Sequence, residues 1–171
     1  MTLIVEDGTG KPDANTYADV ATVRAYATAR GVTLPVDDSA VETSIIQAMD
    51  YLEAQRAKYK GTKSVPGVQA LQWPRLCVTI DGYDWPSDKL PKELISALAQ
   101  CAIEISNGND LQANTTGQVV KREKVDVLET EYMTSDDMGA GASLTPQYKK
   151  VENLLLPLYT VGCGVLRTGR A

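Results

Sequence analysis

The chain has 171 residues, of which 43% are hydrophobic and 23% are charged; these are ordinary values for one globular domain and exclude wholesale disorder. Its net charge of -5 opposes general attraction to a phosphate backbone, so tight nucleic-acid binding would need a strong local basic patch. Histidine is absent, which removes the commonest general base and metal ligand and excludes any nucleophile–histidine pair.

The N-terminal region is predicted to form an extended arm followed by a short helix. Glycine, proline and aspartate within residues 8–13 favour turns and exclude a helix there. Asp19 can accept a hydrogen bond from the free N–H groups at the start of a helix over residues 20–30. Gly31 then suits the left-handed conformation that commonly ends a helix.

The middle of the chain is predicted to hold the longest helix and then a structured loop. Residues 39–42, Ser-Ala-Val-Glu, have the spacing of a capping box, and apolar residues follow at helical intervals, which predicts a helix over residues 40–60. Proline and glycine repeatedly interrupt residues 61–90, so this stretch cannot hold a continuous helix. Trp73 and Trp85 lie in this loop, where they either anchor it to the core or serve a function.

The C-terminal half is predicted to contain two further helices, a hairpin and a tail. Apolar stripes indicate helices over residues 91–107 and 146–158, the second kinked or ended by Pro157. Residues 118–132 carry β-branched side chains on both sides of a charged centre, which predicts a β-hairpin. Residues 160–171 form an apolar and basic tail.

The predicted fold is one domain over residues 1–171 of the mainly α class. It is a small helical bundle with a β-hairpin insertion, a long structured loop and an extended C-terminal tail. No run of residues approaches the length of a transmembrane helix, and the acidic pair Glu6-Asp7 comes too early for a signal-peptide core. We therefore expect no membrane contact and a cytoplasmic site of synthesis and assembly.

The sequence offers little support for catalysis, a metal or a cofactor. No C-x-x-C spacing or complete nucleotide-binding motif is present, so we expect no cofactor and no metal. Cysteines 77, 101 and 163 are expected to be buried free thiols. The acidic pairs are expected to cap helices or to solvate loops; they are Glu6-Asp7, Asp37-Asp38 and Asp136-Asp137.

Two segments are candidates for contact with partners. The hairpin carries the densest basic cluster, which either is simply solvated or makes an electrostatic contact with a neighbouring subunit or with DNA; its cations are Lys121, Arg122 and Lys124. The tail either frays or becomes ordered against another chain. Its candidate contact residues are Val165, Leu166, Arg167 and Arg170.

Short motifs follow one another along nearly the whole chain. They are Ile4-Val5-Glu6-Asp7-Gly8-Thr9-Gly10, Ala14-Asn15-Thr16-Tyr17, Ala25-Tyr26 with Ala29-Arg30-Gly31, Asp50-Tyr51-Leu52, Gln69-Ala70-Leu71-Gln72-Trp73-Pro74-Arg75, Leu90-Pro91, Val120-Lys121-Arg122-Glu123-Lys124-Val125 with Glu131-Tyr132, and Leu154-Leu155. In this order and spacing they resemble a family of tailed-bacteriophage proteins. Members are labelled either head–tail connector or adaptor proteins, or DnaT-like single-strand DNA-binding proteins.

The resemblance implies a structural virion protein, a head–tail adaptor. It would form a dodecameric ring beneath the portal protein, in the neck between head and tail, after assembly in the host cytoplasm. Its partners would be the portal protein, a downstream tail or neck protein and copies of itself. DNA would pass through the ring without specific binding, and no catalytic residue belongs to this role. An acidic subunit is compatible with a channel wall that does not bind the phosphates of the passing DNA.

Two other functions compete with this hypothesis. A single-strand DNA-binding module would need exposed aromatic side chains between basic ones. The candidates for such a surface are Trp73-Pro74-Arg75, Lys58-Tyr59-Lys60 and the basic residues 121–124. A hydrolase that uses carboxylates alone is the remaining alternative, although no carboxylate pair has a context that indicates a raised pKa or a metal site.

Overall fold

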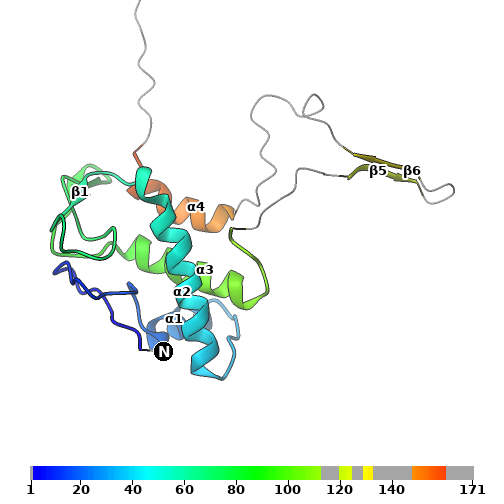
Figure 1. The fold of residues 1–171 in the computed structure, drawn as a ribbon, viewed down its shortest axis with the longest axis horizontal. Coiled ribbons are helices and arrows are strands. Elements are labelled where there is room, and N and C mark those ends of the chain that lie inside the picture. Colours follow the sequence, from blue (N-terminus) through cyan, green and yellow to red (C-terminus); the bar gives the residue numbers. More distant parts are fainter. Residues whose placement is uncertain (1, 113–119, 125–128, 133–147, 161–171) are drawn as a thin grey trace, which may run out of the picture.

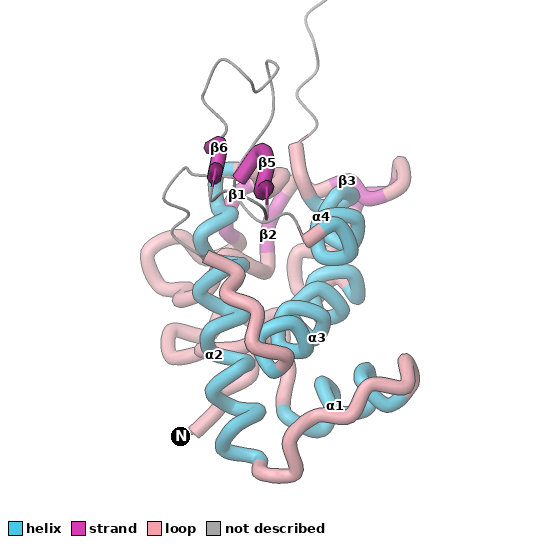
Figure 2. Tube along the Cα trace, turned by 90° about the vertical axis from the view of Figure 1, so that its right-hand side faces the viewer, coloured by secondary structure: helices cyan, strands magenta, loops and turns pink. Residues whose placement is uncertain are grey.

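The helical part of the chain is arranged around one central helix. The computed structural model describes residues 2–112, 120–124, 129–132 and 148–160. Four α-helices lie near the predicted positions; they are α1 (Val20–Thr28), α2 (Asp38–Ala54), α3 (Lys92–Ser106) and α4 (Lys149–Leu155). Helix α3 contacts each of the other three, and α2 runs along the length of the body (Figures 1 and 2).

The central place of α3 follows from its sequence, because apolar or small residues surround most of the helix. Consecutive residues from Ala97 to Ile103 are buried, including the amide of Gln100. The stripe predicted for α2 is also buried, whereas that of α4 is buried at Val151 and Leu155 and only partly at Leu154. One cluster of buried side chains joins the helices, the arm and the loop. Within the described residues, no helix has both the length and the apolar character that crossing a bilayer requires.

The ends of the helices differ from the sequence-based prediction. Asp37, not Ser39, caps α2, because its Oδ1 accepts from the Ser39 N–H at 3.1 Å. The helix also ends at Ala54 and continues only as a short 3₁₀ turn, so it is shorter than predicted. The last helix likewise passes into a 3₁₀ turn around Pro157, in line with the expectation that this proline ends it.

The loop over residues 61–90 contains two small antiparallel hairpins that the sequence did not reveal. They are β1 (Thr62–Lys63) with β2 (Arg75–Leu76), and β3 (Thr79–Ile80) with β4 (Tyr83–Asp84). Strands of two residues are too short to show an alternating pattern. Gly61 is required beside β2, because a Cβ there would lie 2.0 Å from the Leu76 carbonyl oxygen at a φ of +68°.

Candidate interaction surfaces

The segment between α3 and α4 begins and ends at one point on the body. After α3 the chain buries Leu111, and residues 113–147 then intervene before it returns at Tyr148. The Tyr148 hydroxyl donates to the Asp110 carbonyl oxygen at 2.9 Å, which fastens the two ends together. Helices α3 and α4 pack directly on each other. We call residues 113–147, which connect these two helices, the excursion.

The described part of the excursion is the predicted hairpin. Strand β5 (Val120–Lys124) pairs antiparallel with β6 (Glu129–Tyr132), and Figure 1 shows the pair outside the helical body. Arg122 is opposite Glu131 and Lys124 is opposite Glu129, so basic and acidic positions face each other across the ladder. The register shifts between Val120 and Arg122, which leaves Lys121 at an irregularity. Residues 125–128, between the two strands, lie outside the described residues.

The second predicted contact segment cannot be located. Val165, Leu166, Arg167 and Arg170 lie outside the described residues, which end at Thr160. The Thr160 N–H donates to the Lys58 carbonyl oxygen at 2.7 Å, so the start of the tail is held beside the end of α2. The tail's role therefore stays a prediction.

The aromatic residues proposed for base stacking belong to the core. Trp73 is 0% exposed and Tyr59 is 4% exposed, and their rings meet edge to face with centroids 5.9 Å apart. The buried Arg75 guanidinium donates from Nε to the Lys60 carbonyl oxygen at 2.7 Å and from Nη2 to that of Gly61 at 2.6 Å. These side chains cannot meet a nucleic acid without local unfolding, so the anchoring interpretation of Trp73 is confirmed.

Two other aromatic side chains, Tyr26 and Tyr83, are not buried in this core. The Arg30 guanidinium lies 3.4 Å from the centroid of the Tyr26 ring, in a groove of about 490 Å³ between α1, α3 and α4. Tyr83, in the β3–β4 hairpin, is 81% exposed. Sequence reasoning did not single out Tyr83, because its exposure depends on a hairpin of two-residue strands.

The half-buried carboxylate of Glu53 joins the arm, α2 and the loop. Glu53 on α2 accepts from the Tyr17 hydroxyl at 2.5 Å and from the Gln72 N–H at 3.1 Å. The Tyr17 oxygen in turn accepts from the Trp73 N–H at 3.2 Å. Burial raises the pKa of Glu53 more than these hydrogen bonds lower it, and burial likewise raises the pKa of Tyr17.

We expect the raised pKa of Glu53 to appear in the pH dependence of stability. Its carboxyl group holds a proton more tightly in the folded chain than in the unfolded one. Its stabilising contribution is therefore full below the unfolded pKa of about 4.5 and is lost as the pH rises through the folded value. Denaturant unfolding from pH 4 to pH 8 should show this decline in the wild type and a smaller one in Glu53→Gln. Equal slopes for both proteins would contradict the assignment.

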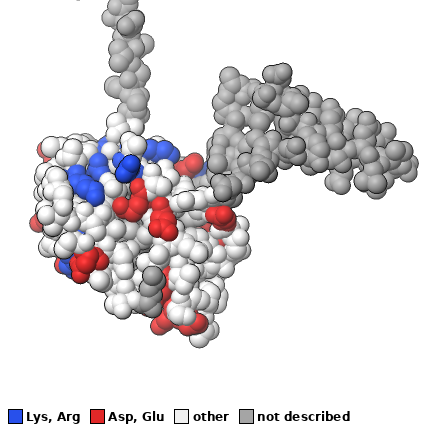
Figure 3. Space-filling model, in the orientation of Figure 1, with Lys and Arg blue, Asp and Glu red and all other residues white. Residues whose placement is uncertain are grey.

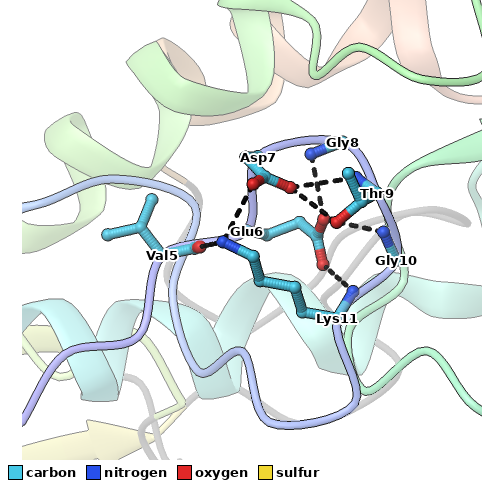
Figure 4. A network of polar contacts seen from close by, with 7 residues as sticks. All are labelled: Val5, Glu6, Asp7, Gly8, Thr9, Gly10 and Lys11. Carbon is cyan, nitrogen blue, oxygen red and sulfur yellow. Dashed lines mark hydrogen bonds and ion pairs between the residues drawn. The ribbon is translucent and has the colours of Figure 1, made fainter.

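The N-terminal loop holds another carboxylate that sequence reasoning misjudged. Glu6 was expected to cap or to solvate, yet it is 2% exposed. Its Oε1 accepts from the N–H groups of Gly8 and Gly10, both at 2.9 Å, and its Oε2 accepts from that of Lys11 at 2.8 Å (Figure 4). The loop therefore folds around this side chain.

Asp7 beside it behaves as a surface carboxylate. The Thr9 hydroxyl donates to Asp7 Oδ1 at 2.7 Å, and Lys11 Nζ lies 2.9 Å from Oδ2 (Figure 4). Hydrogen bonds from the side chains of Thr9 and Lys11 lower its pKa to about 2. Of the other acidic pairs, Asp37 caps α2 as described and Asp38 pairs with Arg24 at 2.7 Å. The pair 136–137 lies outside the described residues.

Charged residues are separated along α2. The exposed Arg56 and Lys58 follow its C-terminal end, and Figure 3 shows Lys and Arg side chains gathered there. Lys58 Nζ lies 5.6 Å from the centroid of the Tyr159 ring. Asp37 and Asp38 lie at the opposite end of the helix. We call these the basic end and the acidic end of the body.

The cysteines agree only in part with expectation. Cys101 is a buried thiol, and burial raises its pKa to about 12. Cys77 is exposed, because it follows the short strand β2 on the surface, so its expected burial is wrong. Cys163 lies outside the described residues. Among the residues that the structure does describe, no three Cys, Asp or Glu side chains gather as metal ligands would.

Comparison with known families bears directly on the competing functions. Over residues 1–171, the chain matches the family described as "Putative DnaT-like ssDNA binding protein". The chain belongs to this family. No curated protein and no solved structure matches the chain significantly. The family description names single-strand DNA binding and does not mention a portal or a tail.

Proposed function

We propose that the chain is a structural subunit of a larger assembly and that the excursion is one of its contact devices. The observation that carries this proposal is the fastening of Asp110 to Tyr148 at the root of the excursion. The helices pack directly on one another, and Figure 1 shows the charged strands β5 and β6 outside them, so the described residues give this hairpin no stabilising role in the body. A neighbouring chain, by contrast, could bury it or pair with its charges.

The specific form that we propose is the head–tail adaptor. In that role the chain would form a dodecameric ring under the portal protein and continue the DNA channel toward the tail, with no catalysis and no cofactor. The resemblance of the ordered motifs to connector proteins supports this form. The net charge of -5 also suits a channel wall that DNA must pass without being held.

Removal of the excursion tests the proposal. In a variant in which a short Gly-Ser linker replaces residues 113–147, we expect the thermal unfolding midpoint to change by only a few degrees. The full chain should add a ring to particles of the cognate portal protein in electron microscopy, and the shortened chain should not. The matched control replaces the same residues with a Gly-Ser segment of equal length, which keeps the tether and removes the side chains.

The outcomes separate the two possible roles of this segment. Unfolding of the shortened chain would show that the excursion belongs to the core. Ring formation by the shortened chain, equal to that of the full chain, would show that the segment is not a contact device.

Single-strand DNA binding is the second candidate, and the family description favours it over the adaptor. The buried Trp73, Tyr59 and Arg75 cannot supply the stacking surface, so binding would rely on the basic end and on Tyr83. Titration of a fluorescent oligo-dT by the full chain, at low and at high salt, tests this function. Tight binding that salt weakens would support it, and the absence of binding at low salt would exclude it.

A further inference from the structure

The basic end is an exposed surface of mixed character. Residues 58–60 pair with residues 158–160, which brings the 3₁₀ turn after α4 next to the end of α2. Lys60 Nζ donates to the Pro157 carbonyl oxygen at 2.8 Å and fixes this turn. Leu156 in this turn is 58% exposed, and Arg56 and Lys58 are exposed after the end of α2. The basic end and the turn that pairs with it therefore present exposed cations and one exposed apolar side chain.

The acidic end has the same combination with the opposite charge. Val36 is 95% exposed and immediately precedes Asp37 and Asp38. Arg24 compensates part of the charge through its ion pair with Asp38 and donates to the Val36 carbonyl oxygen at 3.0 Å. These contacts hold the loop in place, so Val36 is presented on an ordered segment.

The two ends cannot meet within one molecule. Helix α2 has 17 residues and separates them by roughly 26 Å at the standard rise per residue. Figure 2 shows α2 extending from one end of the body to the other. Two surfaces of opposite charge, each with an exposed apolar side chain, therefore face away from each other on every copy.

We propose that the basic end of one copy docks on the acidic end of a second copy. The inference rests on the proposed function, since it names a contact through which the subunits would associate. The contact joins two different surfaces, so it is heterologous and repeats from copy to copy, closing into a ring or continuing as an open chain. Charge complementarity orients the copies, and Leu156 and Val36 lose exposed apolar surface.

The observations favour a protein over a nucleic acid as the occupant of the basic end. A phosphate backbone would pair with Arg56 and Lys58 but would leave Leu156 exposed. The chain's net charge of -5 would also repel a long polyanion. A second copy supplies both the carboxylates and an apolar side chain.

Sedimentation velocity of the full chain tests this inference. We expect the sedimentation coefficient to rise with protein concentration at low salt and to fall when the salt is raised to about 0.5 M. The double variant Arg56→Glu/Lys58→Glu alters the basic end, and Val36→Lys alters the acidic end. Each should raise the dissociation constant about tenfold or more. Lys92→Glu is the matched control, because the Lys92 side chain is 90% exposed on α3 and should have no effect.

Mixing the two altered proteins gives a sharper test. Each retains one intact end, so the equimolar mixture should form dimers and nothing larger, whereas each protein alone should associate about tenfold or more weakly than the wild type. This outcome is specific to a heterologous contact, because a contact that used the same surface twice would not be restored by mixing.

Three results would overturn the inference. The chain could stay monomeric at every concentration, or it could associate equally well with both ends altered. If the chain associates equally well with both ends altered but no longer associates when the excursion is removed, the proposed function remains supported and only this contact is refuted. The third result is salt-sensitive binding of fluorescent oligo-dT by a monomeric chain, lost in Arg56→Glu/Lys58→Glu. That would assign the basic end to nucleic acid.

Discussion

Replacing Trp73 by alanine should destabilise the protein by about 3–5 kcal/mol, the usual cost of truncating a fully buried tryptophan. The side chain is 0% exposed and lies at the junction of the loop with Tyr59. Its loss would leave a cavity that the surrounding backbone, fixed by Arg75, cannot easily fill. Urea unfolding followed by far-ultraviolet circular dichroism would measure the change in the free energy of unfolding.

Two matched variants show whether burial is the cause. Trp73→Phe keeps most of the ring and removes an indole N–H that has no hydrogen-bond partner among the described residues, so it should cost much less than alanine. Trp85 is only partly buried, and its indole donates to the Lys89 carbonyl oxygen at 2.9 Å. Trp85→Ala should therefore cost less, about 1–2 kcal/mol. Equal effects at the two tryptophans would contradict the assignment of Trp73 to the core.

Replacing Glu6 by glutamine should also destabilise the fold, by about 1–3 kcal/mol. The carboxylate accepts from three backbone N–H groups, and a side-chain amide would place its own N–H₂ group against one or more of these donors. The N-terminal loop packs on the structured loop, where a Cβ on Gly8 would lie 2.0 Å from the Asp88 carbonyl oxygen. Loss of the loop's shape would therefore spread to residues 61–90.

Asp7→Asn is the control for Glu6→Gln, since the neighbouring carboxylate is on the surface and should contribute little. Amide hydrogen exchange adds a local measurement. The N–H groups of Gly8, Gly10 and Lys11 should exchange faster in Glu6→Gln and at the wild-type rate in Asp7→Asn. Unchanged exchange at these three positions in Glu6→Gln would mean that the carboxylate is not what shapes the loop.

The two stability predictions also bear on function. Trp73 and Arg75 belong to a motif that resembles the phage family, and their contacts explain it as a structural junction. A Trp73→Phe protein that stays folded should bind oligo-dT no more weakly than the wild type. A loss of oligo-dT binding in that variant would instead indicate that the motif takes part in single-strand DNA binding.

Local patterns in the sequence were sufficient for the positions of the helices and for the hairpin. Apolar residues at helical spacing predicted α2 and α3, and Asp19 predicted the start of α1. The β-branched residues on both sides of a charged centre predicted β5 and β6. Each of these patterns involves only residues that are a few positions apart, so it can be recognised in the sequence without knowledge of the tertiary structure. The absence of histidine likewise narrowed the possible chemistry from composition alone.

Only the tertiary structure decided which residues are available to partners. Trp73 and Tyr59 were candidates for a DNA-stacking surface and Glu6 was expected at the surface, but all three are buried, because segments distant in sequence cover them. The fastening of Asp110 to Tyr148 and the gathering of charge at the two ends of α2 depend on contacts across the fold. Exposure is a property of the packed chain and not of neighbouring residues, and for this reason periodicity and composition could not supply it.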